Sequence, residues 1–531
     1  MLNCVEEEDF NMSLEIVRDT ITLKKRVLNE SLQTIAVNDL IVPDINPDIK
    51  RILVCDGSVF VNNISIDDDM VNLNGDIEYR IIYVSEGEKE QINSASIRTG
   101  FSQEINLQSA KPEHEIKVNS LIEHTECSII NGRKINVKSI IEVQLKAMEN
   151  KNLKIIKDLE NEENLQILRG KTVINCFAGS CEETLELDEK IEIPSGKPNL
   201  REIIRKDLKI TDKEYKIAGN KIIVQGSLNI LTLYTDEEMT GIHYLENEIP
   251  FLKTLEIRDI DEDSYCDVNV KIRESNISID EDNDGETRVL SVEAEILIES
   301  EAFEKREVEY IEDAYSLNRN IKPDREVINM EELISNEQSQ IVIKDVVKLK
   351  EDKPVISEIF NVLNEPVIVE SRIDDNKIIV EGIVNSNILY LSEDSRQLIT
   401  SDKQEIPFNY KFEISGLQSN NNYDVDLFME HSSYSIINQK EIEVRMIIGV
   451  EAKVSREFEI SLVTGLENDT DDDFQNTYLP YITVYFVQPG DTAWGIAKKY
   501  NTTIEEIKEN NEISGNDVYP GQQIIVTKKI C

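Results

Sequence analysis

The chain has 531 residues, and 104 acidic against 57 basic side chains give it a formal net charge of −47. This length exceeds what one core supports and predicts several domains, while the excess of acid argues against binding to nucleic acids or to anionic membrane surfaces. Hydrophobic residues at 40% and charged residues at 30% are typical of a folded protein and argue against wholesale disorder.

The sequence shows no export or membrane signal. No stretch approaches the roughly 20 apolar residues of a membrane span, and the acidic start, MLNCVEEEDFNMSLEIVRD, lacks the apolar run of a signal peptide. We therefore expect a cytoplasmic protein. Its seven cysteines include no C-x-x-C pair, so we interpret them as buried or free thiols, with Cys176 and Cys181 as a weak metal or redox signal.

A repeat organises the first 460 residues. Three segments share the pattern Pro-x-Ile/Leu-x-x-Ile-apolar: PDIKRIL from Pro47, PNLREII from Pro198 and PVISEIF from Pro354. A glycine follows each proline by 28 residues, and each glycine is followed by a tyrosine after eight residues and by a phenylalanine after 25 or 26. These landmarks are Gly75, Gly226 and Gly382, then Tyr83, Tyr234 and Tyr390, then Phe101, Phe251 and Phe408. Their common phase indicates a triplicated domain.

The pattern within each copy predicts a mainly β fold. Runs such as KIIVQGSLNILTLY alternate apolar and polar positions and are rich in β-branched residues, as antiparallel strands are. The segment after each landmark proline has the apolar spacing of one short helix. We expect domains at 12–150, 165–310 and 327–460, separated by charged linkers at 147–164 and 311–326, with an acidic linker at 464–480. The pattern leaves open whether each domain is a sandwich or a barrel.

Two acidic stretches raise the question of metal binding. Asp280, Asp282 and Asp284 have the spacing of an EF-hand loop, but the twelfth position is Ser291 where a bidentate Glu is needed. The other copies read NGRK and NQKE at this place, so an acidic hairpin turn is the preferred interpretation. The run at 471–473 is interpreted as a solvated spacer. We predict no metal site.

Residues 481–529 predict a small module of strand, turn, helix, helix, turn and strand. Asp491 or Thr492 is placed to cap the first helix, and Thr503 with Glu506 forms a capping box for the second. Pro520 and Gly521 then turn the chain into a closing strand. The expected fold class is therefore mainly β, with three tandem antiparallel β-rich repeat domains followed by a small βααβ module.

This ending resembles a LysM domain. The resemblance is carried by Tyr485, Val487, Gly490, Asp491, Thr492, Trp494, Ile496, Ala497, Tyr500, Asn511, Pro520 and Gly521. It implies a shallow groove for N-acetylglucosamine polymers, with walls formed by Gly490, Asp491, Thr492, Ala493 and Trp494 and by Glu512, Ile513, Ser514, Gly515 and Asn516.

Two residues of this groove raise questions. Ala493 replaces the large aliphatic residue usual after Gly-Asp-Thr, which weakens the case for glycan binding. Trp494 is equally consistent with a role in the core of the module and with a ligand contact.

The triplicate resembles the SPOCS domain, formerly DUF3794, through its proline-led entry, its Gly-to-Tyr strand and its Ile-Pro-Phe element. Three such copies before one LysM module are similar in architecture to a morphogenetic protein of clostridial spores. The resemblance implies that the module docks to a coat-basement ATPase (SpoIVA-like). It also implies a location in the mother-cell cytoplasm, at the forespore surface and spore coat.

Catalysis has little support in the sequence. We find no Walker A loop, no dinucleotide fingerprint, no H-E-x-x-H and no G-x-S-x-G, and none of the four histidines keeps the repeat phase. We therefore predict a non-enzymatic scaffold or adaptor, with no catalytic residues and no cofactor. The alternative is a peptidoglycan-binding protein of the cell wall or cortex, which requires export. An enzyme is a third possibility, because LysM modules are often attached to wall hydrolases.

Overall fold

The protein is built almost entirely from β-strands. The structure, a computed structural model, describes residues 15–67, 70–87, 91–107, 111–160, 164–236, 242–317, 321–393, 399–468, 482–511, 513 and 518–527. Within these ranges the only α-helices are two short ones near the C-terminus, and neither has the length and apolarity to cross a membrane. The predicted fold class, three β-rich repeats and a small βααβ module, is confirmed.

Each repeat contains six antiparallel strands in two three-stranded sheets. The first repeat has β1 (Glu15–Ile41), β2 (Ile49–Asp67), β3 (Met70–Ser85), β4 (Ile92–Asn106), β5 (Glu115–Asn131) and β6 (Lys134–Glu160). The second has β7 (Leu165–Glu192), β8 (Glu202–Ala218), β9 (Lys221–Thr235), β10 (Ile242–Glu256), β11 (Tyr265–Asp280) and β12 (Val289–Ser316). The third has β13 (Ile321–Lys348), β14 (Ile356–Asp374), β15 (Lys377–Ser392), β16 (Ile399–Glu413), β17 (Asn422–Asn438) and β18 (Glu441–Asn468).

The two sheets of a repeat pack face to face. In the first repeat their orders are β1-β6-β5 and β2-β3-β4, and the other repeats follow the same plan. One hydrophobic core lies between them, as in the second repeat, where Leu228 of β9 and Phe251 of β10 share a cluster with Val268 of β11 and Ile296 of β12. Each repeat is therefore a β-sandwich, the arrangement by which two half-apolar sheets bury their inner faces.

The landmark residues of the repeat contact one another. The hydroxyl groups of Tyr83, Tyr234 and Tyr390 donate hydrogen bonds to the carbonyl oxygens of Pro47, Pro198 and Pro354, at 3.0, 3.1 and 2.9 Å. All three tyrosines are fully buried, so this bond gives each hydroxyl the partner that burial requires.

The glycines and phenylalanines of the repeat are cross-strand neighbours. The register places Gly75 opposite Phe101, Gly226 opposite Phe251 and Gly382 opposite Phe408. In the second and third repeats the ring occupies the space of a side chain on the glycine, because a Cβ at Gly226 or Gly382 would lie 2.8 or 2.4 Å from it. The glycine of each repeat therefore makes room for its neighbours across the sheet.

The expected short helix after each landmark proline is wrong. These segments begin the edge strands β2, β8 and β14. Each strand has a register shift near its start, for example at Ile359/Asn361 in β14. A β-bulge inserts an extra residue and interrupts the two-residue alternation, which explains why Ile356, Ile359 and Phe360 have the spacing of a helix.

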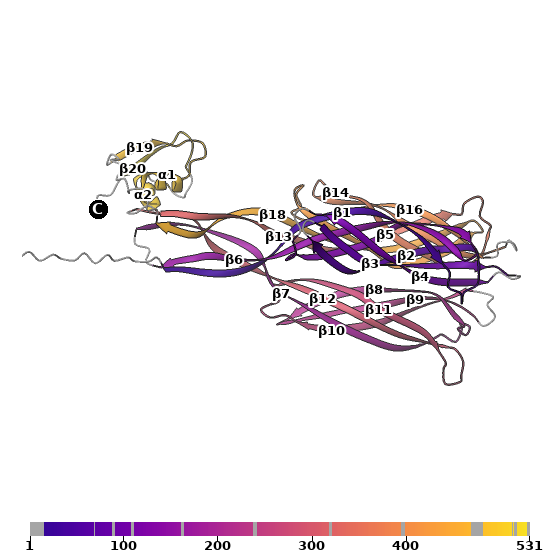
Figure 1. Cartoon of the computed structure of the whole chain (residues 1–531). Coiled ribbons are helices and arrows are strands. Elements are labelled where there is room, and N and C mark those ends of the chain that lie inside the picture. Colours follow the sequence, from indigo (N-terminus) through magenta and orange to yellow (C-terminus); the bar gives the residue numbers. More distant parts are fainter. Residues whose placement is uncertain are drawn as a thin grey trace, which may run out of the picture.

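The stretches expected as linkers at 147–164 and 311–326 are strand wherever the structure describes them, except at Asn164 and Leu317. β6 runs to Glu160, β12 runs to Ser316 and β13 begins at Ile321. We call the paired ends of the long strands the stalks: 15–26 with 148–160, 165–177 with 303–316, and 321–333 with 455–468. Figure 1 shows them leaving the sandwiches toward the C-terminal module. The expected acidic linker at 464–480 overlaps β18 to Asn468, and its remainder lies outside the described residues.

The three repeats bury apolar residues against one another in two places, within the stalks and between the sandwiches. In the stalks, one cluster contains Ile21, Ile174 and Ile328 from the three first strands of the repeats. Between the sandwiches, a second cluster, which we call the shared core, contains the equivalent residues Ile82, Leu233 and Leu389 of β3, β9 and β15. These residues face away from the core of their own repeat, so the three sandwiches are held together by apolar burial.

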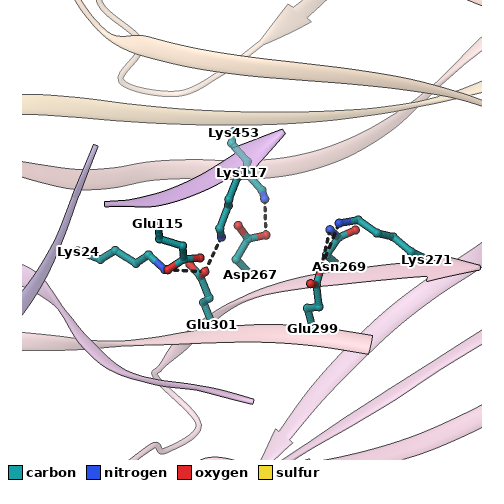
Figure 2. A network of polar contacts seen from close by, with 9 residues as sticks. All are labelled: Lys24, Glu115, Lys117, Asp267, Asn269, Lys271, Glu299, Glu301 and Lys453. Carbon is teal, nitrogen blue, oxygen red and sulfur yellow. Dashed lines mark hydrogen bonds and ion pairs between the residues drawn. The ribbon is translucent and has the colours of Figure 1, made fainter. Parts of the chain in front are cut away.

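Charged residues also join the repeats (Figure 2). The ammonium group of Lys24, whose side chain is 1% exposed, contacts Glu115 of its own repeat at 2.6 Å and Glu301 of the second repeat at 2.7 Å. Burial lowers the pKa of Lys24, but hydrogen bonds and attraction from the two carboxylates outweigh it and leave the pKa raised. Lys453 of the third repeat likewise pairs with Asp267 of the second at 2.5 Å.

We expect Lys24→Ala to lower the free energy of unfolding by about 3 kcal/mol, because it leaves the largely buried Glu301 without one of its cations. Lys271→Ala is the matched control, since the Lys271–Glu299 pair is exposed and lies within one repeat; its loss should cost less than about 1 kcal/mol. Urea denaturation measures both variants. Equal losses of unfolding free energy would show that the Lys24–Glu301 pair between repeats contributes no more to stability than the Lys271–Glu299 pair within one repeat.

Among the five cysteines that the structure describes, one pair differs from the expectation of buried or free thiols. Cys55 of β2 and Cys127 of β5 form a disulfide that joins the two sheets of the first repeat. Their sequence separation of 72 residues gave no sign that the sandwich places them face to face. Cys176, Cys181 and Cys266 are free. Burial raises the pKa of both Cys176 and Cys266 to about 11, so these two thiols are poor nucleophiles.

The C-terminal module consists of β19 (Ile482–Phe486), α1 (Ala493–Tyr500), α2 (Ile504–Asn511) and β20 (Gln523–Thr527). The two strands pair antiparallel into a ribbon. The helices cover one face of it through a cluster that includes Val487, Ile496, Ala497, Ile507 and Ile524. Of the two caps expected for α1, Thr492 is the one observed, since its Oγ1 accepts a hydrogen bond from the Gly495 amide at 3.0 Å. Thr503 Oγ1 accepts one from the Glu506 amide at 3.1 Å, which is one half of the expected capping box.

Candidate functional site

The turn before α1 forms the first predicted wall of the groove. Gly490 has a φ of +91°, a conformation that favours glycine. The Asp491 carboxylate accepts hydrogen bonds from the Gln488 amide and the Tyr485 hydroxyl, both at 2.7 Å. The backbone bond from Gln488, followed by the bond from Tyr485, lowers the pKa of Asp491. Asp491 therefore shapes the turn, while Gly490 and Thr492 are exposed.

Ala493 does not line a groove. Its side chain is 1% exposed, and with Ile496 and Ala497 it is one of the buried residues of α1. The expectation that alanine removes aliphatic surface from a ligand-binding wall is therefore wrong, because a larger residue here would change the packing of the core.

Trp494 contacts a different part of the chain. Its indole N–H donates a 2.7 Å hydrogen bond to Asp313 of β12, and its ring meets Tyr315 edge-on with centroids 4.9 Å apart. The sequence left a core role and a ligand contact equally open. The structure packs Trp494 against the apolar cluster of the module and also gives it a role that the sequence did not suggest, a contact between the module and the second stalk.

The second predicted wall lies mostly outside the described residues. Glu512, Ser514, Gly515 and Asn516 belong to that part. Ile513 is half-buried against the apolar cluster of the module, and its amide donates to the Lys508 carbonyl at 3.2 Å. The structure thus describes six of the ten predicted site residues. Two of these six, Gly490 and Thr492, are exposed.

The outer face of the ribbon carries exposed apolar side chains beside Gln523 and Thr527 of β20, a feature that sequence reasoning missed. Ile482, Val484 and Phe486 of β19 are 63%, 52% and 53% exposed, and Ile525 of β20 is 40% exposed. Val484 and Ile525 are paired across the ribbon, so the four side chains form one row, here called the ribbon row. The signal in the sequence was the alternation in ITVYF, whose outward positions are all apolar; among the described residues this strand pairs with β20 alone.

The acidic stretch of the second repeat is a turn between β11 and β12, as predicted. Asp282 Oδ1 accepts hydrogen bonds from the amides of Asp284 and Glu286, both at 2.9 Å, and Gly285 has a φ of +80°. Asp280 pairs with Lys190 at 2.8 Å. Across the described residues no group of three or more His, Cys, Asp or Glu side chains is arranged to hold a metal ion.

Comparison with protein families agrees with this division of the chain. A family described as "SipL, SPOCS domain" matches residues 48–130, 199–280 and 355–437, and the LysM domain family matches 485–527. The chain carries three SPOCS domains and one LysM domain. Each SPOCS match begins one residue after a landmark proline and ends at or near the end of the fifth strand of its repeat, so the stalks lie outside the matched segments.

Three curated relatives match over 44 to 46 residues, about the length of the LysM domain. Over 44 residues the chain is 52% identical to a "Probable autolysin SsaALP" of Staphylococcus aureus, covering 8% of this chain and 17% of the relative. It is 38% identical over 45 residues to a "Probable N-acetylmuramidase" of Lactococcus lactis, and 37% identical over 46 residues to an "Uncharacterized protein YkzQ" of Bacillus subtilis. These matches cover 8% and 9% of this chain and 10% and 61% of the relatives.

The chain thus spans less than two thirds of the length of each of these relatives, and no solved structure matches it. The SPOCS family relates the chain to sporulation, and the LysM family is of the peptidoglycan-binding class. Neither family is catalytic.

Proposed function

We propose that the protein is a non-enzymatic scaffold or adaptor of spore coat assembly. In this proposal the LysM domain docks to a coat-basement ATPase (SpoIVA-like) and so localises the coat around the forespore, in the mother-cell cytoplasm. The ribbon row is the observation that carries the proposal. Contiguous exposed apolar side chains mark interaction surfaces in soluble proteins, and these four are exposed in the part of the chain that the structure describes.

The ribbon row favours a protein partner over a glycan. Ile482, Val484, Phe486 and Ile525 offer no polar side-chain atom to orient a sugar, whereas an apolar centre with a polar rim is the usual anatomy of a protein interface. Trp494, the aromatic residue of the predicted groove, is meanwhile engaged by Asp313. The SPOCS repeats support the link to sporulation.

Peptidoglycan or another N-acetylglucosamine polymer is the second candidate ligand. The likeness of the LysM domain to a probable autolysin and a probable N-acetylmuramidase favours it. In this alternative the ligand would occupy the turn at 490–494 and the protein would belong to the wall or cortex.

We expect Val484→Asp to reduce co-purification of the coat-basement ATPase with the tagged full-length chain from sporulating cells by at least about tenfold. A charge in the centre of the ribbon row would be desolvated without a partner. Val327→Asp is the matched control, because Val327 of β13 is 62% exposed on a stalk. Immunoblotting for the ATPase gives the readout, and equal recovery with wild type and Val484→Asp would remove the ribbon row from the interface.

A further inference from the structure

The LysM domain is fastened to the second stalk through one buried carboxylate. Asp313, 7% exposed, accepts the indole N–H of Trp494 at 2.7 Å and contacts the ammonium group of Lys498 at 2.7 and 2.8 Å. Arg325 of β13 pairs with the same carboxylate at 2.5 Å. Trp494 and Lys498 are four residues apart on α1, so both lie on the same side of that helix.

A second set of contacts surrounds this carboxylate. Tyr315 is 5% exposed and belongs to the same apolar cluster as the core of the LysM domain. Its hydroxyl donates a 2.6 Å hydrogen bond to the carbonyl of Thr502, and Asn501 donates its side-chain N–H to the carbonyl of Leu317 at 2.9 Å. The contact therefore combines apolar burial with hydrogen bonds that have specific partners.

The three stalks differ at the positions that make this contact. The clustered residues Ile156, Ile311 and Val463 are equivalent, which places Asp158, Asp313 and Gly465 at one position of the three stalks. In the first stalk Asp158 pairs with Arg169 at 2.8 Å. Two residues further on, the chain has Glu160, Tyr315 and Glu467. Only the second stalk therefore combines the carboxylate with the aromatic residue that packs on Trp494.

The length of the connecting chain makes docking efficient. Thirteen residues, 469–481, join the end of β18 to the start of β19, and such a segment spans at most about 45 Å. A tether of this length keeps the LysM domain at an effective concentration on the order of millimolar near the stalk. Even a contact of modest intrinsic affinity is then mostly formed.

We propose that the end of the second stalk is a docking site for the chain's own LysM domain, and that docking withholds the Trp494 wall of the LysM groove from glycan. The proposal rests on the LysM domain being the binding module. The ribbon row stays exposed in the docked state, so a protein partner reaches its surface while a glycan has to displace the stalk from Trp494.

Trp494 is the only tryptophan of the chain, so its fluorescence reports docking directly. In full-length protein we expect Tyr315→Ala to shift the emission to longer wavelength and to increase quenching by acrylamide, because the indole loses its ring contact and gains solvent. Asp313→Asn should act in the same direction through loss of the ion pairs. Titration with N-acetylglucosamine hexamer, followed through the same indole, should show binding about tenfold tighter in both variants than in wild type.

Asp158→Asn is the matched control, since it changes the equivalent position of a stalk that carries no LysM domain, and circular dichroism checks that each variant is folded. Unchanged emission in both Tyr315→Ala and Asp313→Asn would overturn the docking. Red-shifted emission without tighter hexamer binding would overturn the withholding of the groove. Co-purification of the ATPase through the ribbon row is a separate readout, so failure of the proposed protein partner is distinguishable from failure of the docking.

Discussion

Gly75→Ala should lower the free energy of unfolding by about 3 kcal/mol, because the new Cβ would lie 1.9 Å from the carbonyl oxygen of Phe60 on the neighbouring strand. The clash is with backbone, so β2 or β3 has to move. Gly75 is the landmark glycine of the first repeat and lies opposite Phe101 on its other side. Chemical denaturation of the full-length chain measures the loss.

Gly100→Ala is the matched control for this prediction. Gly100 lies on β4 of the same sheet, opposite Asp76, and a Cβ there would meet no atom within 4 Å. The substitution should leave the free energy of unfolding within about 0.5 kcal/mol of wild type. If the two alanine variants were equally stable, close contact between β2 and β3 would not explain why the repeat has a glycine at position 75.

Leu233→Ala should destabilise all three SPOCS domains at once, by about 2–5 kcal/mol. Leu233 is fully buried in the shared core, where its neighbours include Ile82 of the first repeat and Leu389 of the third. Truncation leaves a cavity at the point where the sandwiches meet. Hydrogen exchange read by mass spectrometry should show faster exchange in β3 and β15 as well as in β9.

Leu228→Ala is the control for this second prediction, because Leu228 is equally buried on the same strand but faces the core of its own repeat. Its effect on exchange should be greatest in the strands of the second repeat. Faster exchange confined to the second repeat in Leu233→Ala would contradict the shared core and would favour three separable domains.

The repeat was predictable because its landmarks serve the fold of each copy. The bond from Tyr234 to Pro198 and the pair formed by Gly226 and Phe251 recur in every repeat, so the phase of these residues was visible before their contacts were known. The arrangement of the repeats was harder to predict. Residues such as Leu233 that join the sandwiches lie on the second face of β9. Leu231 and Leu233 place apolar side chains on that face, but this pattern does not say which other strands cover it.

The candidate site was predicted less well than the module that carries it. Caps, turns and core positions of the LysM domain follow local rules, which explains why the caps were expected at Asp491 or Thr492 and at Thr503, close to where the structure has them. The role of Trp494 depends on Asp313, which is 181 residues away in the sequence and belongs to another domain. Ala493 was misassigned for a different reason. The family pattern placed it in the groove, whereas its side chain is buried.

The most direct test of the proposed function is equilibrium binding of the purified full-length chain to the purified coat-basement ATPase, with peptidoglycan sedimentation run in parallel. The account predicts saturable binding to the ATPase that Val484→Asp abolishes and Val327→Asp preserves, together with weak sedimentation by peptidoglycan. Strong sedimentation by peptidoglycan that Val484→Asp leaves unchanged, with no binding to the ATPase, would contradict the account and favour a wall-binding protein.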